Sequence, residues 1–201
     1  MSLVAPSALP ERPLFRLRRR AASAALLVGL LLLAAAMGVA GWIGWGPEFA
    51  LQSIAVYGLG SACMLLGLQG HAPHRRFGAA NVLTLFRLAM IALLAGTIGR
   101  ALPADPAPLA WSVVVFATVT AVLDAADGPL ARGQRLASEF GARFDMECDA
   151  LLVAVLCLLI VQFDKAGAWV LAAGATRYVF VLAGRAWPWI AQPLFPSWRR
   201  K

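Results

Sequence analysis

The sequence predicts an all-α integral membrane protein, a bundle of about six transmembrane helices. Of its 201 residues, 61% are hydrophobic and the mean hydropathy is +0.74, well above an ordinary soluble domain. Several apolar runs have the roughly 20 residues that a helix needs to cross a bilayer. The basic residues give a net charge of +8 and cluster between these runs. They therefore suit anionic headgroups and phosphate-bearing substrates better than nucleic acid.

The N-terminal part of the chain predicts two helices behind a basic tail. Residues 1–20 end in consecutive arginines and are expected to form a cytoplasmic tail. The apolar run over 21–45 is too long for the hydrophobic region of an ordinary signal peptide, so we expect a retained membrane helix instead of a cleaved signal. A second span is expected over 49–68. With the basic loop that follows, these two helices make up an extra N-terminal region, 21–78.

The C-terminal region, 79–201, is expected to contain four more helices. One of them carries Pro129, which lacks a backbone donor and crowds the preceding turn, so a kink or a helix end is predicted there. The expected spans are about 80–102, 109–123 with a continuation into the acidic residues that follow, 140–162 and 167–186.

Four aspartates stand in this apolar region at fixed spacing: Asp124, Asp127, Asp145 and Asp149. Positions three or four residues apart lie on the same side of a helix, so the spacing predicts two helices that each show a pair of carboxylates on one face. The same faces carry residues with almost no side chain, namely Gly128, Ala131 and Gly141.

Converging carboxylates in a membrane protein require positive charge nearby. An acidic residue at a membrane helix centre costs about 2.5–3.5 kcal/mol, and like charges at short range repel. Two Mg²⁺ or Mn²⁺ ions would balance four carboxylates and could clamp a pyrophosphate. The alternative is a set of salt bridges between helices with close packing of the small residues. We disfavour it because Arg132, Arg135 and Arg143 cannot neutralise every carboxylate.

The segment from Asp124 to Asp149 resembles the signature D-x2-D-G-x2-A-R-x8-G-x3-D-x3-D of the CDP-alcohol phosphotransferases, also called CDP-alcohol phosphatidyltransferases. Every fixed position is matched. Upstream, Asn81-Val-Leu-Thr84-Leu-Phe-Arg87 is similar to the N-x2-T-x2-R element of the same family. The resemblance covers about 81–185.

This resemblance implies a transferase of phospholipid synthesis. It would move a phosphatidyl group, or another substituted phosphate, from a CDP-alcohol to the hydroxyl of a small polar alcohol and release CMP. CDP-diacylglycerol is the expected donor. By the resemblance, all four aspartates are ligands of two Mg²⁺ or Mn²⁺ ions, and Asp149 is also the general base. The other implied substrate contacts are small residues that leave room for the nucleotide (Gly128, Ala131, Gly141), phosphate-binding side chains (Arg132, Ser138) and polar residues lining the nucleotide pocket (Asn81, Thr84).

Family members typically continue with two more helices, whereas this sequence stops in a basic cluster at Lys201. We expect a domain that is truncated at its C-terminus; the alternative is that the two N-terminal helices replace the missing ones. Homodimers are common in the family. The acceptor alcohol, the acyl chains and the oligomeric state cannot be read from the sequence.

The distribution of charge predicts the orientation. With the N-terminus inside, most basic residues fall on one side, as the positive-inside rule requires. The protein would then lie in the inner membrane of the cell, with its carboxylates open to the cytoplasm. CDP-linked substrates are made on that side. Two other functions fit the sequence less well. A membrane prenyltransferase also uses aspartates with Mg²⁺ but lacks this glycine and arginine framework, and a cation or proton transporter would need acids near the bilayer middle.

Overall fold

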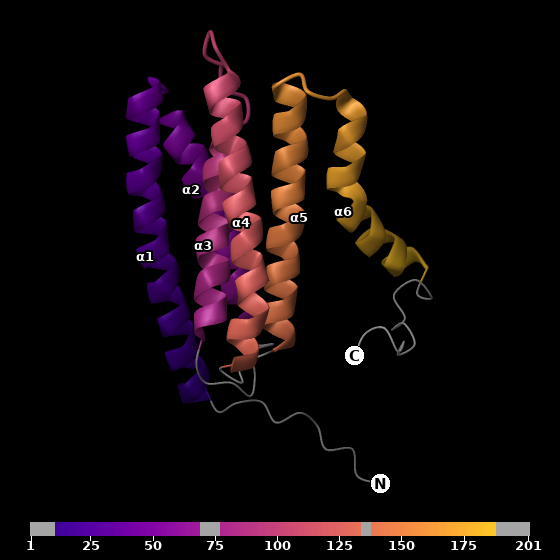
Figure 1. The fold of residues 1–201 in the computed structure, drawn as a ribbon. Helices are drawn as coiled ribbons and strands as arrows, with labels where there is room; N and C mark the ends of the chain where they lie inside the picture. The colour runs from indigo at the N-terminus through magenta and orange to yellow at the C-terminus, as the bar shows by residue number, and fades with distance from the viewer. Residues whose placement is uncertain (1–10, 69–76, 134–137, 188–201) are drawn as a thin grey trace.

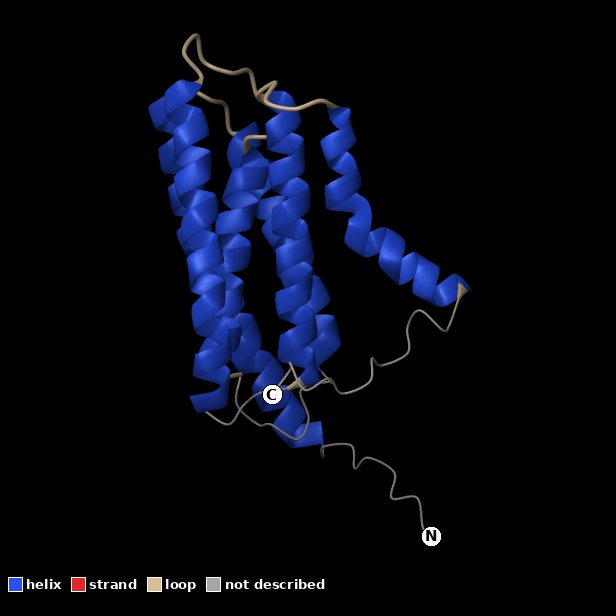
Figure 2. Ribbon diagram, turned by 45° about the vertical axis from the view of Figure 1, so that its right-hand side comes forward, coloured by secondary structure: helices blue, strands red, loops and turns tan. Residues whose placement is uncertain are grey.

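The computed structural model describes residues 11–68, 77–133 and 138–187, with side chains described except at 11–14, 125–133 and 139. Within these residues all regular structure is helical, which confirms the predicted all-α class (Figures 1 and 2). The six α-helices, with a 3-10 turn η2 (Ala168–Val170) leading into the last, are α1 (Glu11–Ile43), α2 (Glu48–Gly67), α3 (Ala79–Gly96), α4 (Ala107–Gly133), α5 (Glu139–Gln162) and α6 (Leu171–Ala186).

Four of these helices are long and apolar enough to cross a membrane. Their outward faces carry large apolar side chains, such as Leu26, Leu27 and Leu30 of α1, and a surface of this kind suits lipid. The spans are Phe15–Ile43, Glu48–Gly67, Ala79–Gly96 and Ala107–Asp124. Among the described residues, α5 carries several carboxylates in its N-terminal half and α6 is only 16 residues long. The protein is therefore an integral membrane protein, with four candidate spans among its described residues.

Three helix ends differ from the sequence prediction. Helix α1 begins at Glu11, ten residues before the expected span, because Leu17 and Ala21 continue its buried stripe. Helix α3 ends at Gly96, not near 102, since Thr97 caps it and Gly99 adopts a positive φ of 77°. Helix α4 does not end at Pro129 but continues to Gly133.

Helix α3 is the central element of the bundle. It packs against α1, α2, α4 and α5. Of its apolar segment, 67% is buried inside the protein, more than in any other candidate span. The contact with α2 is close at two points. A Cβ added at Gly60 would lie 2.8 Å from a methyl carbon of Leu88, and one added at Gly96 would lie 2.3 Å from Ser53 Oγ.

At the C-terminal end of α3, three polar side chains bind the last backbone carbonyls. We call this group, Gln52, Arg100 and Gln162, the polar clamp. Gln52 Nε2 of α2 donates to the carbonyl of Ala95 at 2.9 Å, and Gln162 Nε2 of α5 donates to that of Thr97 at 3.0 Å. Arg100 joins them by donating to Gln52 Oε1 at 2.9 Å. The carbonyls of Ala95 and Thr97 also accept bonds from the backbone N–H groups of Ile98 and Arg100, so the glutamines add bonds between helices, and Gln162 ties α5 to the end of α3.

Helix α6 packs only along part of its length. Near its start, Gly174 lets α6 approach α5 so closely that an added Cβ would lie 3.2 Å from the Cα atom of Ala154. The C-terminal half of α6 then turns away from α5 in both ribbon views (Figures 1 and 2). This divergence opens a groove on the side of α5 that bears its carboxylates.

Candidate active site

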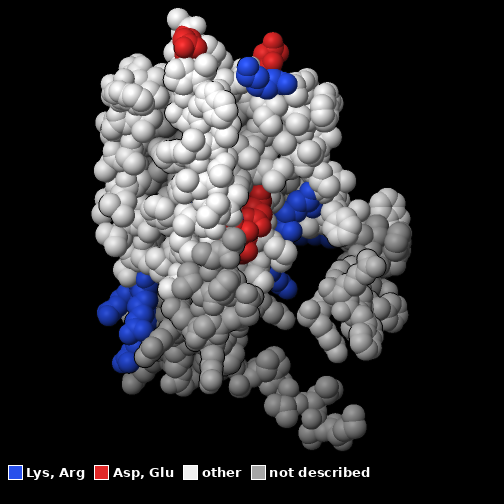
Figure 3. All heavy atoms as spheres, viewed as in Figure 1, with Lys and Arg blue, Asp and Glu red and all other residues white. Residues whose placement is uncertain are grey.

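Three of the predicted aspartates converge in the half of the bundle that holds the C-terminal part of α4 and the N-terminal half of α5. Asp124 comes from α4, and Asp145 and Asp149 come from successive turns of α5. One carboxylate oxygen from each lies within 4.8 Å of the other two. Their side chains are 38%, 32% and 48% exposed, respectively, so the cluster opens to the surface. Figure 3 shows acidic atoms reaching the surface over the lower part of α4 and α5.

A buried arginine forms the floor of this cluster. The Arg87 side chain, on α3, is 0% exposed, and its Nη1 contacts Oδ1 of Asp124 at 2.7 Å and Oδ1 of Asp145. Its Nη2 contacts Asp149 Oδ1 at 2.5 Å. Helices α4 and α5 each pack against α3 more extensively than against one another, as far as the described residues show. One guanidinium therefore joins the two helices that carry the two halves of the aspartate motif.

Arg87 corrects the charge balance drawn from the sequence. The charge comparison in the sequence analysis used Arg132, Arg135 and Arg143 and omitted Arg87. Arg87 is the last residue of the polar stripe of α3, which consists of Asn81, Thr84 and Arg87. Ion pairing between helices, which we disfavoured, does occur here. Among the described side chains it is incomplete, because one guanidinium faces three carboxylates.

The cluster fits a divalent cation. Carboxylate oxygens are the donors that Mg²⁺ and Mn²⁺ prefer, and three of them lie within reach of one ion. Each contact with Arg87 uses one oxygen, Oδ1, so the second oxygen of each carboxylate can serve as a ligand. The carboxylates and their partial exposure give a cation both attraction and access.

The fourth aspartate and its neighbours belong to the last turns of α4. The helical backbone continues through Asp127, Gly128, Ala131 and Arg132, but their side chains lie outside the described part of the chain. Asp127 follows Asp124 by three residues and so shares its helix face. Its role as a ligand, the phosphate contact of Arg132 and the space left by the small residues remain predictions.

The polar stripe of α3 lies beside the start of α5. Asn81 and Thr84 are 6% and 3% exposed. Asn81 Nδ2 donates to the carbonyl of Phe77, and Thr84 Oγ1 donates to that of Ala80 at 3.0 Å. A Cβ added at Gly141 would lie 3.2 Å from Asn81 Oδ1. The close approach of α5 to α3 is thus one physical reason for glycine at position 141. The space that glycine would leave for a nucleotide is a second, predicted reason.

Ser138 caps the N-terminus of α5. Its backbone is extended, and its Oγ accepts a hydrogen bond from the Gly141 amide at 3.1 Å, as serine commonly does at this position. The structure thus assigns Ser138 a local folding role that the sequence analysis did not consider. Phosphate binding by its hydroxyl is still a prediction, as is nucleotide binding by Asn81 and Thr84.

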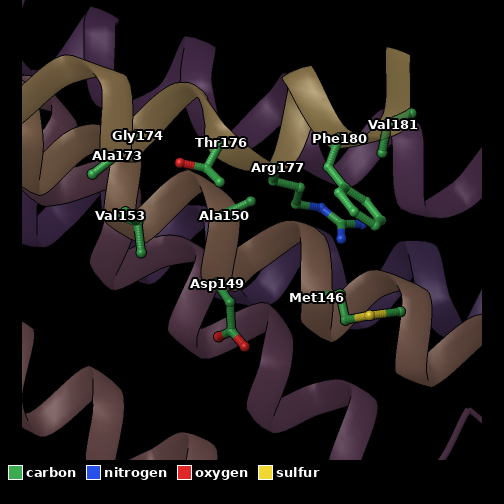
Figure 4. A pocket seen from close by; sticks show the side chains of 10 residues that line it. All are labelled: Met146, Asp149, Ala150, Val153, Ala173, Gly174, Thr176, Arg177, Phe180 and Val181. Carbon is green, nitrogen blue, oxygen red and sulfur yellow. The ribbon is translucent and has the colours of Figure 1, made fainter. Parts of the chain in front are cut away.

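A groove of about 480 Å³ lies between α5 and α6 on the other side of Asp149. Its wall is mostly apolar, with Asp149, Thr176 and Arg177 as polar members (Figure 4). Asp149 therefore belongs both to the carboxylate cluster and to the groove. Arg177 and this groove were not anticipated from the sequence, because the path of α6 depends on packing that no local pattern encodes.

Comparison with known proteins agrees with the signature. The family model described as CDP-alcohol phosphatidyltransferase matches residues 77–198. The chain is 34% identical over 116 residues to a CDP-diacylglycerol--glycerol-3-phosphate 3-phosphatidyltransferase of Pectobacterium atrosepticum, across 56% of this chain and 60% of that protein. No solved structure matches. Since the family match spans more than half of the chain and contains both sequence elements, the protein belongs to the CDP-alcohol phosphatidyltransferase family.

Proposed function

We propose that this protein transfers a phosphatidyl group from CDP-diacylglycerol to the hydroxyl of a small polar alcohol and releases CMP. The observation that carries the proposal is the position of Asp149, between the carboxylate cluster and the α5–α6 groove. A transferase must bring its acceptor hydroxyl within reach of the general base and, at the same time, within reach of the donor phosphorus. The cluster suits the diphosphate of the donor, and the groove offers a separate path to the same carboxylate.

On the donor side, the residues hold charge and position. Asp124, Asp127, Asp145 and Asp149 would bind two divalent cations, which neutralise the diphosphate and stabilise the charge that develops on it. Arg87 holds three of these carboxylates at one place from below. Such orientation before reaction lowers the barrier, because the reacting groups need not be assembled in the transition state.

On the acceptor side, Asp149 takes the proton. An alcohol is a poor nucleophile until a base within hydrogen-bonding reach removes its proton during attack. The acceptor oxygen forms a bond to the phosphorus that bears the diacylglycerol, while the bond from that phosphorus to the oxygen of CMP breaks. The proton passes to Asp149, and CMP leaves with the electron pair of the broken bond.

Glycerol 3-phosphate is the first acceptor to test. The relative from Pectobacterium is named for transfer to glycerol 3-phosphate, and the groove beside Asp149 contains a basic side chain, Arg177. Because the chain spans only about 60% of that relative, glycerol 3-phosphate is proposed as the acceptor and is not taken over from the relative.

We also propose that the site faces the cytoplasm. The exposed arginines at 16, 18, 19 and 20 lie in the first turns of α1, at the end of the bundle where α3 and α5 begin (Figure 1). The positive-inside rule favours a cytoplasmic position for such a cluster. A cysteine introduced near position 18 should react with a membrane-impermeant reagent only after the membrane is opened, and labelling of intact cells would contradict the orientation.

The reaction is tested with purified protein, labelled CDP-diacylglycerol and a panel of alcohols with and without a phosphate. Release of CMP that depends on one alcohol, together with the matching phospholipid as product, is the expected result. Binding of CDP-diacylglycerol with no CMP release for any alcohol, in the presence of Mg²⁺ or Mn²⁺, would refute the transferase proposal.

A further inference from the structure

A second charged pair lies next to the active site, on the groove side. Arg177 of α6 donates to Glu147 of α5, with Nη2 2.5 Å from Oε1 and Nε 3.4 Å from Oε2. The two side chains are 29% and 56% exposed. Figure 4 shows Arg177 extending from α6 over the groove whose opposite wall holds Asp149.

The composition of the groove wall makes this arginine distinctive. Among the described residues that line it, Asp149 and Arg177 are the only ionisable ones, and the others are Thr176 and apolar side chains. A carboxylate suited to accept a proton thus shares one cavity with a guanidinium suited to bind an anion. A guanidinium presents several donors in a planar fork that matches phosphate and carboxylate groups.

We propose that Arg177 binds the anionic group of the acceptor alcohol, and that Glu147 competes for Arg177 when no acceptor is present. This inference rests on the proposed transferase function. The acceptor would place its hydroxyl at Asp149 and its phosphate at Arg177. The diphosphate of the donor is the less suitable partner, because it belongs with the carboxylates contacted by Arg87 of α3, whereas Arg177 approaches from α6.

Glu147 is suited to be displaced. It lies two residues from Asp149, and side chains at that spacing do not share a helix face, so Glu147 reaches Arg177 from outside the set that lines the groove. An exposed ion pair of this kind contributes little to stability. A phosphate with its larger charge and three acceptor oxygens can replace one carboxylate at modest cost.

The test compares three variants of the full chain in phosphatidylcholine nanodiscs, which offer no anionic lipid as a competitor. Arg177→Gln should raise the KM for glycerol 3-phosphate about 10- to 100-fold, the loss expected for a charge-assisted hydrogen bond. Glu147→Gln should lower that KM, by up to about fivefold. Arg185→Gln, an exposed arginine in the last turn of the same helix, is the matched control and should change nothing.

Opposite changes in KM for the two variants would distinguish binding of the acceptor by Arg177 from an ion pair that only holds α5 and α6 together. If Arg177→Gln and Glu147→Gln raise KM equally, the pair only holds the helices together and the proposal is wrong. If Arg177→Gln weakens binding of CDP-diacylglycerol in the absence of acceptor, the bound anion belongs to the donor. Either result overturns the assignment.

A binding measurement separates this inference from the reaction. Glycerol 3-phosphate is titrated into the protein without donor, followed by the change in tryptophan fluorescence or by calorimetry. Wild type should bind it and Arg177→Gln should bind it at least about tenfold more weakly. Absence of binding to the wild type refutes the role of Arg177, whereas binding without any CMP release refutes the transferase proposal alone.

Discussion

Replacing Arg87 with glutamine removes the one described positive group that contacts all three carboxylates. Glutamine can still donate a hydrogen bond, but its side chain is shorter than that of arginine, carries no charge and cannot reach two helices at once. Breaking a buried ion pair costs about 3–5 kcal/mol. The carboxylates are 32–48% exposed, so water compensates part of the loss, and the lower end, about 3 kcal/mol, is the appropriate figure.

This loss should appear as a lower melting temperature. For a protein of this size, 1 kcal/mol corresponds to about 2–4 °C, so Arg87→Gln should melt about 6–12 °C below wild type in metal-free buffer. Arg87→Lys should fall between the two, because an ammonium keeps the charge but lacks the fork. Arg143→Gln, an exposed arginine on α5, is the matched control and should melt like wild type.

The same variant should respond more strongly to divalent cations. Without Arg87, three carboxylates face each other with no other described cation in contact with them, so Mg²⁺ should raise the melting temperature more in Arg87→Gln than in wild type. Turnover should still fall about 100-fold, since misplacement of reacting groups by about 1 Å has an effect of this size. Thermal unfolding monitored by tryptophan fluorescence and a CMP-release assay measure both. Equal melting temperatures for Arg87→Gln and Arg143→Gln, or equal shifts with Mg²⁺, would refute this account of the site.

Three further outcomes are expected. Asp149→Asn should lower kcat by about 10²–10⁴, the usual effect of removing a general base, while affinity for CDP-diacylglycerol falls much less; near-normal kcat would show that another group takes the proton. Excess EDTA should abolish CMP release, and added Mg²⁺ or Mn²⁺ should restore it; unchanged activity in EDTA would contradict the cation site. Gly96→Val should destabilise the protein by about 1–3 kcal/mol, because its first side-chain carbon would lie 2.3 Å from Ser53 Oγ; the exposed Gly58→Ala, with open space around it, should not, and similar melting of both variants would argue against close packing of α2 and α3.

The aspartate spacing was sufficient to predict the core of the site. Residues three and four apart must share a helix face, so Asp145 and Asp149 had to point the same way whatever the rest of the fold did. Convergence with Asp124 then followed from the need to place several carboxylates around a common charge. Hydropathy likewise predicted the helices, because length and apolar composition are local properties.

The features that the sequence did not reveal depend on contacts between distant residues. Arg87 lies far along the chain from the carboxylates it binds, and only the packing of α4 and α5 on α3 brings them together. The bonds that Gln52 and Gln162 make to the end of α3 likewise come from other helices and have no local signal in the sequence. Arg177 lines the groove beside Asp149 only because α6 packs against α5 at this point.

The polar clamp limits how far the carboxylates of α5 can move relative to α3. Gln162 pins α5 to the end of α3, and Asp149 lies 13 residues away along the same helix, a lever arm of about 20 Å at 1.5 Å per residue. A tilt of about 5° about that pin would move the carboxylate by nearly 2 Å, about the length of a whole Mg²⁺–oxygen bond. The hydrogen bond of Gln162, far along α5 from Asp145 and Asp149, therefore helps to fix the positions of these two carboxylates, together with Arg87. Among the described residues, helix α6 has no such fixed point along its C-terminal half, which diverges from α5 (Figures 1 and 2).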